Sequence, residues 1–134
     1  MKQISVFIEN KAGRLAEVTG FLAEAGINIQ ALSIADTTDF GILRLIVDDA
    51  DGAKSLLKSH GLTVKTTEVI TIALEHTPGS LANVLKELER ENISIEYMYA
   101  FTSRSAELDA MVVLRLTNQD EALEKLKQCN VRIV

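Results

Sequence analysis

The chain has 134 residues, a net charge of −5 and a pI near 5.0, with 47% hydrophobic and 25% charged side chains. This composition is typical of a globular protein with one average domain or two small ones. The acidity argues against nucleic-acid binding, which needs concentrated Lys and Arg, and no apolar run approaches the ~20 residues that span a membrane. The single cysteine, Cys129, cannot form an internal disulfide. We therefore expect a cytoplasmic protein that binds neither nucleic acid nor membranes.

The first half of the chain predicts six elements in the order strand, helix, strand, strand, helix, strand. Ile4, Val6 and Ile8 alternate with outward-facing residues, which indicates a strand. The apolar spacing of the next segment indicates a helix that ends at Gly26. Further strands are expected at 27–35 and 41–47, a helix at about 53–60, stopped by Gly61, and a last strand at 62–67.

The second half repeats the first. Residues 4–29 and 70–95 are identical at nine of 26 positions, at an offset of 66. The L-R-L at 43–45 matches the L-R-L at 114–116, which places about five extra residues near 102–109. The expected strands of this half are 69–75, 93–102, 109–117 and 131–134, and its helices are 79–91 and 120–128.

The chain is therefore predicted to contain two copies of a βαββαβ unit, residues 1–66 and 67–134. Each copy has the ferredoxin-like order, an α+β fold with a four-stranded antiparallel sheet and both helices on one face.

The loop after the first strand is the strongest candidate site. It reads E-N-K-A-G-R-L from Glu9 and E-H-T-P-G-S-L from Glu75. In the second copy Thr77 fits a helix N-cap and Pro78 the first helical position. A helix start presents free backbone N–H groups and partial positive charge, and a glycine lets a ligand approach closely, so a carboxylate could bind there. The alternative is an ordinary capped helix that binds only water.

The junction G-I-N-I at 26–29 is a second candidate. The amide of Asn28 offers a donor and an acceptor, which suits the ammonium and carboxylate of a zwitterion. The alternative is a residue that merely follows the end of a helix. Ser94 stands at the matching position of the second copy and has less hydrogen-bonding capacity.

Three aromatic residues, Tyr97, Tyr99 and Phe101, lie at strand spacing. They would stack on a ligand, or fill the core or a self-association face; the second interpretation is favoured. RNA-binding units of this topology carry aromatics on other strands with basic neighbours. His76 and Ser80 flank a helix start without an orienting acid, so we expect no catalysis. Two histidines and one cysteine also predict no metal site and no cofactor.

The loop E-N-K-A-G-R-L and the junction G-I-N-I, in a βαββαβ unit used twice, resemble ACT domains, which are small regulatory modules that bind amino acids. The resemblance covers essentially the whole chain. The first copy is similar to the serine-sensing ACT domain of phosphoglycerate dehydrogenase, whose loop reads H-E-N-R-P-G, although Ile8 and Ala12 replace its His and Pro.

By this resemblance, Asn10 and Asn28 would hold the polar groups of an amino acid, and the amides near Gly13 would hold its carboxylate. The implied ligand-binding residues are Asn10, Lys11, Ala12, Gly13, Arg14, Leu15, Asn28 and Ile29. A second possible site in the other copy has His76, Pro78, Gly79, Ser80, Leu81 and Ser94.

The resemblance also implies that the two domains pair side by side into one larger sheet, with ligand at the seam between them. Contacts from the opposite second strand would come from Leu32, Met98, Tyr99 and Ala100. Phe7, Ile42 and Ile46 are expected on the sheet face away from the helices, which predicts a homodimer. The function expected is that of a non-catalytic, allosteric amino-acid sensor. The alternative is a regulatory subunit or assembly module of an amino-acid biosynthetic enzyme.

Overall fold

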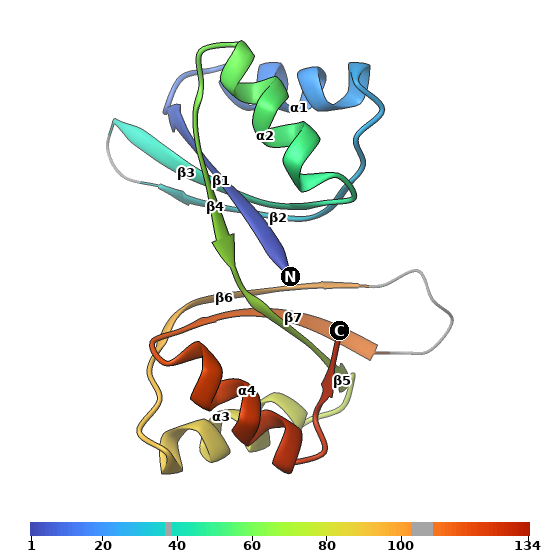
Figure 1. The fold of residues 1–134 in the computed structure, drawn as a ribbon, viewed down its shortest axis with the longest axis vertical. Helices are drawn as coiled ribbons and strands as arrows, with labels where there is room; N and C mark the ends of the chain where they lie inside the picture. The colour runs from blue at the N-terminus through green and yellow to red at the C-terminus, as the bar shows by residue number, and fades with distance from the viewer. Residues whose placement is uncertain (37–38, 103–108) are drawn as a thin grey trace. The chain divides into compact units, whose positions relative to one another are not determined.

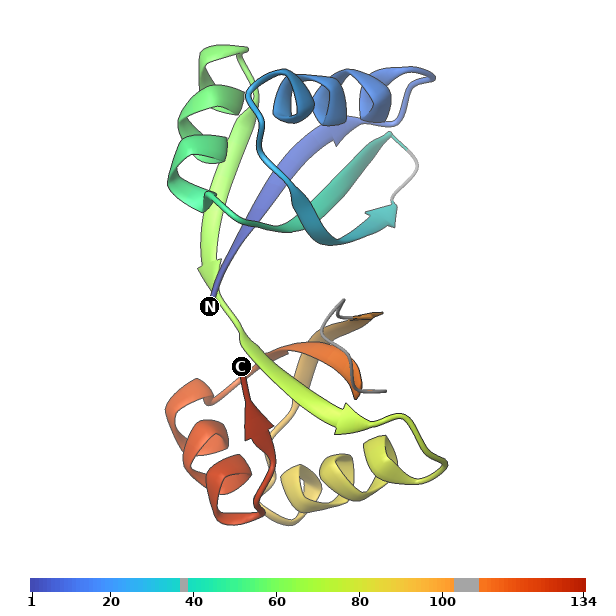
Figure 2. The ribbon, with the colours of Figure 1, turned by 90° about the vertical axis from the view of Figure 1, so that its right-hand side faces the viewer.

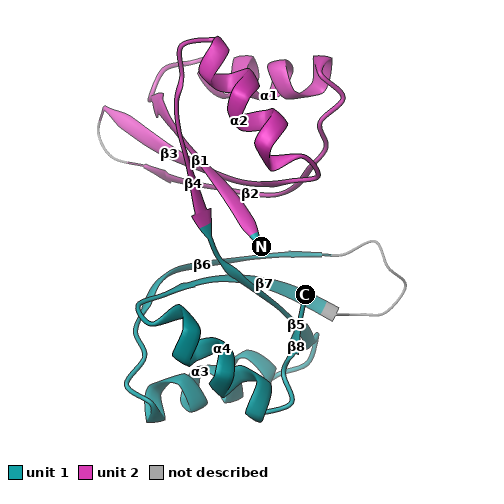
Figure 3. Ribbon diagram, in the orientation of Figure 1, with its two compact units in different colours: residues 1, 68–134 teal, residues 2–67 magenta. Residues whose placement is uncertain are grey.

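The computed structural model describes residues 1–36, 39–102 and 109–134. The chain divides into two compact units, Lys2–Thr67, and Met1 together with Glu68–Val134 (Figure 3). The first half contains β1 (Lys2–Glu9), α1 (Arg14–Glu24), β2 (Ile29–Asp36), β3 (Phe40–Val47), α2 (Ala50–Ser59) and β4 (Thr63–Glu68). The second half contains β5 (Ile70–Glu75), α3 (Ser80–Arg90), β6 (Ile95–Thr102), β7 (Asp109–Leu116), α4 (Gln119–Gln128) and β8 (Arg132–Ile133).

Each unit has one antiparallel sheet of four strands, in the orders β2-β3-β1-β4 and β6-β7-β5-β8. Within each unit both helices lie on one face of its own sheet (Figures 1 and 2). The predicted βαββαβ order is confirmed in both copies. The described strands form two four-stranded sheets, one in each unit, and the side-by-side pairing of the two domains into one larger sheet stays a prediction. The edge strands β2 and β6 have one paired neighbour each, β3 and β7.

The core of each unit lies between the sheet and its helices. In the first unit the alternating side chains of β1 meet Val18 and Leu22 of α1 and Leu57 of α2, all fully buried. In the second unit Val84 and Leu88 of α3 occupy the places of Val18 and Leu22. The alternation of strand side chains is thus the feature that fixes which face each helix covers.

The other face of the first sheet carries the residues that we expected there. Phe7 lies opposite Ile42 in the β1–β3 register, away from the helices, and 45% of its surface is exposed. On β2, Leu32 and Ile34 lie opposite core residues of β3 but remain 49% and 42% exposed. They are exposed because the helices pack on β1 and β3 rather than on this edge strand.

The register also corrects the sequence match between the copies. Ile4 lies opposite Leu45, and its equivalent Ile70 lies opposite Leu114. Leu45 therefore corresponds to Leu114, at an offset of 69, and the match of 43–45 with 114–116 is wrong by two residues. The second copy is longer by three residues rather than five, since the offset grows from 66 to 69 between β6 and β7. That hairpin contains residues 103–108, which lie outside the described part of the chain.

The four helices of the described segments have 10 or 11 residues, and none is long and apolar enough to cross a membrane. The same segments contain no group of three or more His, Cys, Asp or Glu side chains arranged to hold a metal ion.

Candidate functional site

The loop between β1 and α1 is a tight turn held by its own backbone. The Lys11 N–H donates to the Glu9 carbonyl at 2.9 Å, and the Arg14 N–H donates to the Lys11 carbonyl at 3.2 Å. Gly13 precedes the helix as its N-cap with φ 84° and ψ −13°, and the Glu17 N–H donates to its carbonyl at 3.0 Å. The helix therefore starts without a side-chain cap, on a residue in the left-handed conformation.

Glycine suits this position because residues with a Cβ pay about 1–2 kcal/mol in the left-handed conformation. A Cβ built on Gly13 meets no atom within 4 Å, so the loop is open on that side. Among the described residues, the N–H groups of Gly13, Leu15 and Ala16 have no hydrogen-bond partner. Three free donors at the positive end of a helix can bind an anion.

Ion pairs surround this helix start. Lys11 Nζ lies 2.7 Å from Glu9 Oε2, and Arg14 lies 3.7 Å from Glu9 and 3.2 Å from Glu17. The hydrogen bond from Lys11, followed by the charge of Lys11 and more weakly that of Arg14, lowers the pKa of Glu9 below its ordinary value, although desolvation opposes them. The loop and first turn thus carry two cations, each paired with a carboxylate of Glu9 or Glu17.

The second copy reproduces this loop bond for bond at an offset of 66. The Thr77 N–H donates to the Glu75 carbonyl at 2.8 Å, and the Ser80 N–H donates to the Thr77 carbonyl at 3.4 Å. Gly79 is the N-cap, with φ 91°. Two independent copies of one turn, each requiring a left-handed glycine, show that this conformation is a property of the motif.

The prediction that Thr77 is the N-cap is wrong. Because Gly79 is left-handed, the helix cannot include it and begins at Ser80. The Thr77 hydroxyl lies 2.8 Å from the Ser80 hydroxyl and caps no backbone N–H, and Pro78 lies before the helix. The exposed His76 precedes them, and Leu81 in the first turn of α3 is 36% exposed. Hydroxyl groups thus replace the Lys11 and Arg14 cations of the first copy.

Asn10 and Asn28 do not converge within one copy, contrary to expectation. The Asn10 N–H donates to the Asp39 carbonyl at 3.0 Å, beside the first residue of β3. Asn28 lies at the other end of β3, where its N–H donates to Asp48 Oδ1 at 3.0 Å. The length of β3, at ~3.4 Å per residue, separates the two ends by about 24 Å. Both asparagines flank α1, whose 11 residues span about 16 Å between them.

The surroundings of the two amides also differ. Asn10 Nδ2 donates to Asp36 Oδ2 at 3.4 Å, so this side chain ties the loop to the end of β2. The Asn28 side chain is exposed, not buried, and Ile29 follows it at the start of β2. Ser94 repeats the Asn28 position, with its N–H donating to Thr117 Oγ1 at 3.2 Å. The sequence analysis missed these side-chain acceptors, although Asp48 and Thr117 each follow the third strand of their copy.

The four residues expected to contact ligand from an opposite strand lie on β2 and β6. Leu32 is half exposed on the edge strand β2. Met98 packs against the second core, and Ala100 is exposed on the same side of β6. Tyr99 lies opposite Val113, on the face away from the helices. A single ligand beside β6 would therefore not meet Met98 and Tyr99 on one face.

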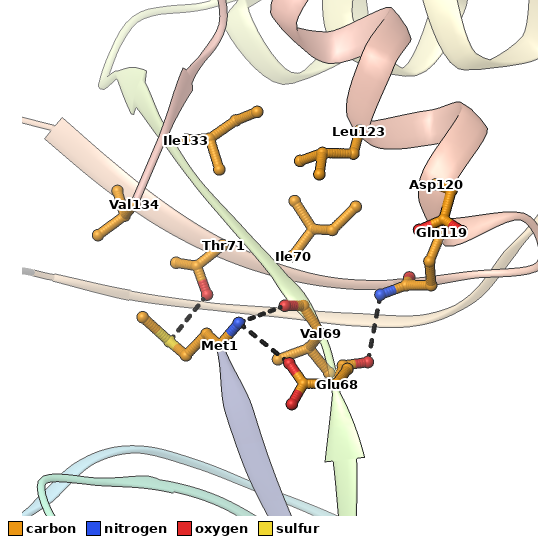
Figure 4. A pocket seen from close by; sticks show the side chains of 10 residues that line it. All are labelled: Met1, Glu68, Val69, Ile70, Thr71, Gln119, Asp120, Leu123, Ile133 and Val134. Atoms are coloured by element: carbon orange, nitrogen blue, oxygen red, sulfur yellow. Dashed lines mark hydrogen bonds and ion pairs between the residues drawn. The ribbon is translucent and has the colours of Figure 1, made fainter.

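A cavity of about 340 Å³ lies elsewhere, at the start of β5 in the second unit, and the sequence analysis did not anticipate it (Figure 4). Ile70 forms its floor, flanked by Leu123 of α4 and Ile133 of β8. Gln119 Nε2 donates to the Glu68 carbonyl at 3.2 Å, which fixes one wall. The cavity combines an apolar floor with a polar rim and is distinct from the two glycine loops.

Comparison with known proteins identifies related sequences and structures. A family model described as an ACT domain pair matches residues 1–134. The small subunit of acetolactate synthase isozyme 3 from Escherichia coli K12 is 29% identical over 70 residues, which cover 52% of this chain and 43% of that subunit. The matched region therefore spans less than half of this relative.

Two solved structures show the same arrangement of elements. Protein BT0572 from Bacteroides thetaiotaomicron is 47% identical, with a TM-score of 0.93 over 99% of this chain and 90% of that one. The regulatory subunit of aspartate kinase from Thermus thermophilus, in a ligand-free form, has a TM-score of 0.68 at 20% identity, covering 95% of this chain and 91% of that one. At this identity the second likeness shows the fold alone.

Proposed function

Because the chain belongs to the family of ACT domain pairs, we propose that it is a non-catalytic regulatory protein that binds an amino acid. The observation that carries the proposal is the glycine loop before α1, with its three free N–H groups and two adjacent cations. The same backbone turn before α3 supplies a second site without those cations.

The chemistry of the first loop fits one end of an amino acid. Its carboxylate would accept hydrogen bonds from the N–H groups of Gly13, Leu15 and Ala16, at the positive end of α1. Its ammonium would lie toward the acceptor oxygens of Asn10 and Glu9. Ligand binding can regulate a protein only if it favours one conformation or assembly over another. Such regulation requires no catalytic residues.

Asn28 takes part only if it comes from a different domain than the glycine loop, because about 24 Å separate it from Asn10 in its own unit. We therefore place the ligand between two ACT domains, of one chain or of two copies in a homodimer. The loop of one domain would hold the carboxylate, and the start of the second strand of the other would complete the site.

The alternative is a regulatory subunit that assembles with an amino-acid biosynthetic enzyme. The observation that favours it is the match to the acetolactate synthase small subunit. In this case the protein's main activity would be docking to a large catalytic partner. Affinity capture from cell extract, with partner identification and a test of whether amino acids change the partner's activity, separates the two proposals.

A thermal-shift screen of the twenty amino acids tests the main proposal. A ligand at 100 times its dissociation constant stabilises the protein by about 2.7 kcal/mol, which is easily measured. Titration calorimetry on Gly13→Ala then locates the site. Gly61→Ala is a matched control, because both glycines have positive φ, 84° and 80°, and neither Cβ would meet an atom within 4 Å.

Both variants should lose similar stability, while only Gly13→Ala should lose affinity, by about tenfold or more if one charge-assisted bond is lost. If Gly13→Ala bound the amino acid as tightly as the parent, the ligand would not bind at this loop. If Gly79→Ala alone abolished binding, the site would lie in the second copy.

A further inference from the structure

The internal repeat allows the cavity at the start of β5 to be compared with the same place in the first unit. Glu68 corresponds to Lys2, because Ile70 corresponds to Ile4. Helix α4 follows α2 at an offset of 69, so Asp120 corresponds to Asp51. The same offset makes Leu123 the equivalent of Lys54. Two lysines of the first unit are thus replaced by a glutamate and a leucine.

In the first unit this place is occupied by the chain's own ammonium group. Lys2 Nζ lies 3.4 Å from both carboxylate oxygens of Asp51, which is the first-turn acid of α2. In the second unit Asp120 has no ion pair or hydrogen bond through its side chain among the described residues, and Glu68 cannot replace the missing lysine. Glu68 is itself paired with the Met1 ammonium at 3.4 Å.

The cavity lined by these two acidic residues has the size and surface for a small apolar group. Its volume of about 340 Å³ is in the range of small-molecule sites. Ile70 is 6% exposed, and Leu123 and Ile133 are partly buried on either side of it (Figure 4). Thr71 is 1% exposed, and among the described residues its hydroxyl donates only to the Met1 sulfur, a weak acceptor, at 3.1 Å.

We propose that this cavity binds a small primary aliphatic amine, whose ammonium takes the place that Lys2 Nζ has in the first unit. The ammonium would bind the exposed Asp120 carboxylate, whereas Glu68 adds little net charge because it is already paired with the Met1 ammonium. The hydrocarbon part would lie on Ile70, Leu123 and Ile133 and displace the flexible Met1 side chain from Thr71. This site is independent of the glycine loops, so neither proposal depends on the other.

The test is a titration of the full chain with isopentylamine, followed by the methyl NMR signals of the isoleucines and leucines. Saturable shifts are expected at Ile70, Leu123 and Ile133. Isopentanol has the same hydrocarbon but no charge. It should bind at least about tenfold more weakly than isopentylamine, since it lacks the charge-assisted bond. Isovalerate should bind more weakly than isopentylamine, because Glu68 and Asp120 together carry one more negative charge than the Met1 ammonium balances.

Three variants make the result specific. Asp120→Asn should weaken amine binding by about tenfold. Glu68→Lys should abolish it, because the new side chain supplies the ammonium that Lys2 supplies in the first unit; the exposed Glu68 contributes little to stability. Asp51→Asn is the matched control in the first unit and should leave amine binding unchanged.

The proposal is wrong if isopentylamine and isopentanol bind equally well, which would indicate an apolar groove without amine selectivity. It is also wrong if amine binding survives in Glu68→Lys, or if the shifted methyl groups lie outside the cavity. The loss of amino-acid binding in Gly13→Ala has no bearing on this result, since that loop belongs to the other unit.

Discussion

Two glycines of one helix should respond to the same substitution with opposite signs. Gly13 is the left-handed N-cap of α1, with φ 84°, whereas Gly20 lies inside the helix and has no positive φ. A Cβ built on either glycine meets no atom within 4 Å. Steric clashes are therefore absent in both cases, and backbone conformation alone decides the effect.

The magnitudes follow from this geometry. Gly13→Ala forces an L-residue into the left-handed region and should lower the free energy of unfolding by about 1–2 kcal/mol. Gly20→Ala replaces a poor helix former by the best one and should raise it by about 1 kcal/mol. The two variants should thus differ by about 2–3 kcal/mol, although each adds one methyl group at an open position.

Urea unfolding followed by far-UV circular dichroism measures both values. Tyrosine fluorescence is unsuitable, because Tyr97 and Tyr99 lie in β6 of the other unit. Amide exchange of α1 provides a local check. If Gly13→Ala were as stable as the parent, or if both substitutions changed stability in the same direction, the assignment of Gly13 as a conformationally required glycine would be refuted.

Three further predictions concern single side chains. Asp49→Ala should destabilise α2 by about 0.5–2 kcal/mol, because the Asp49 carboxylate caps a first-turn N–H. Asn118 is the equivalent N-cap of α4 but makes no such bond, so Asn118→Ala should cost less stability. Urea unfolding of the two variants compares them. Leu22→Ala should cost about 2–5 kcal/mol, because Leu22 is fully buried between α1 and the sheet, and an unchanged urea midpoint would contradict the core assignment. Lys11→Met should remove the partner that lowers the pKa of Glu9. A lowered carboxyl pKa stabilises the fold above the ordinary pKa, so the difference between parent and variant should be present at neutral pH and vanish as the pH falls through the pKa of Glu9 in the folded protein.

The fold could be predicted from the sequence because its signals are local. The alternation of Ile4, Val6 and Ile8 identifies the buried face of β1, and Gly26 and Gly61 mark where α1 and α2 end, both with positive φ. Repetition of the pattern at an offset of 66 made the two-unit order clear.

The errors came from features that local signals do not determine. Thr77 has the chemistry of an N-cap, but the backbone of Gly79 places the helix start later. The match of the L-R-L at 43–45 with that at 114–116 relied on sequence identity alone. Strand pairing shows instead that Leu114 is the residue equivalent to Leu45. Asn10 and Asn28 flank the same helix in sequence, and only the antiparallel register shows that they lie at opposite ends of β3.

The junction of the two units has a consequence for how the protein folds and opens. β4 ends at Glu68 and β5 begins at Ile70, so Val69 alone separates the last strand of one sheet from the first strand of the other. β4 completes its sheet beside β1, while β5 lies inside its own sheet between β7 and β8. During synthesis all four strands of the first sheet are complete before β5 is made. A force that detaches β4 would act directly on β5, which is a central strand of the second sheet. Unfolding of one unit should therefore spread to the other, since no flexible linker separates them.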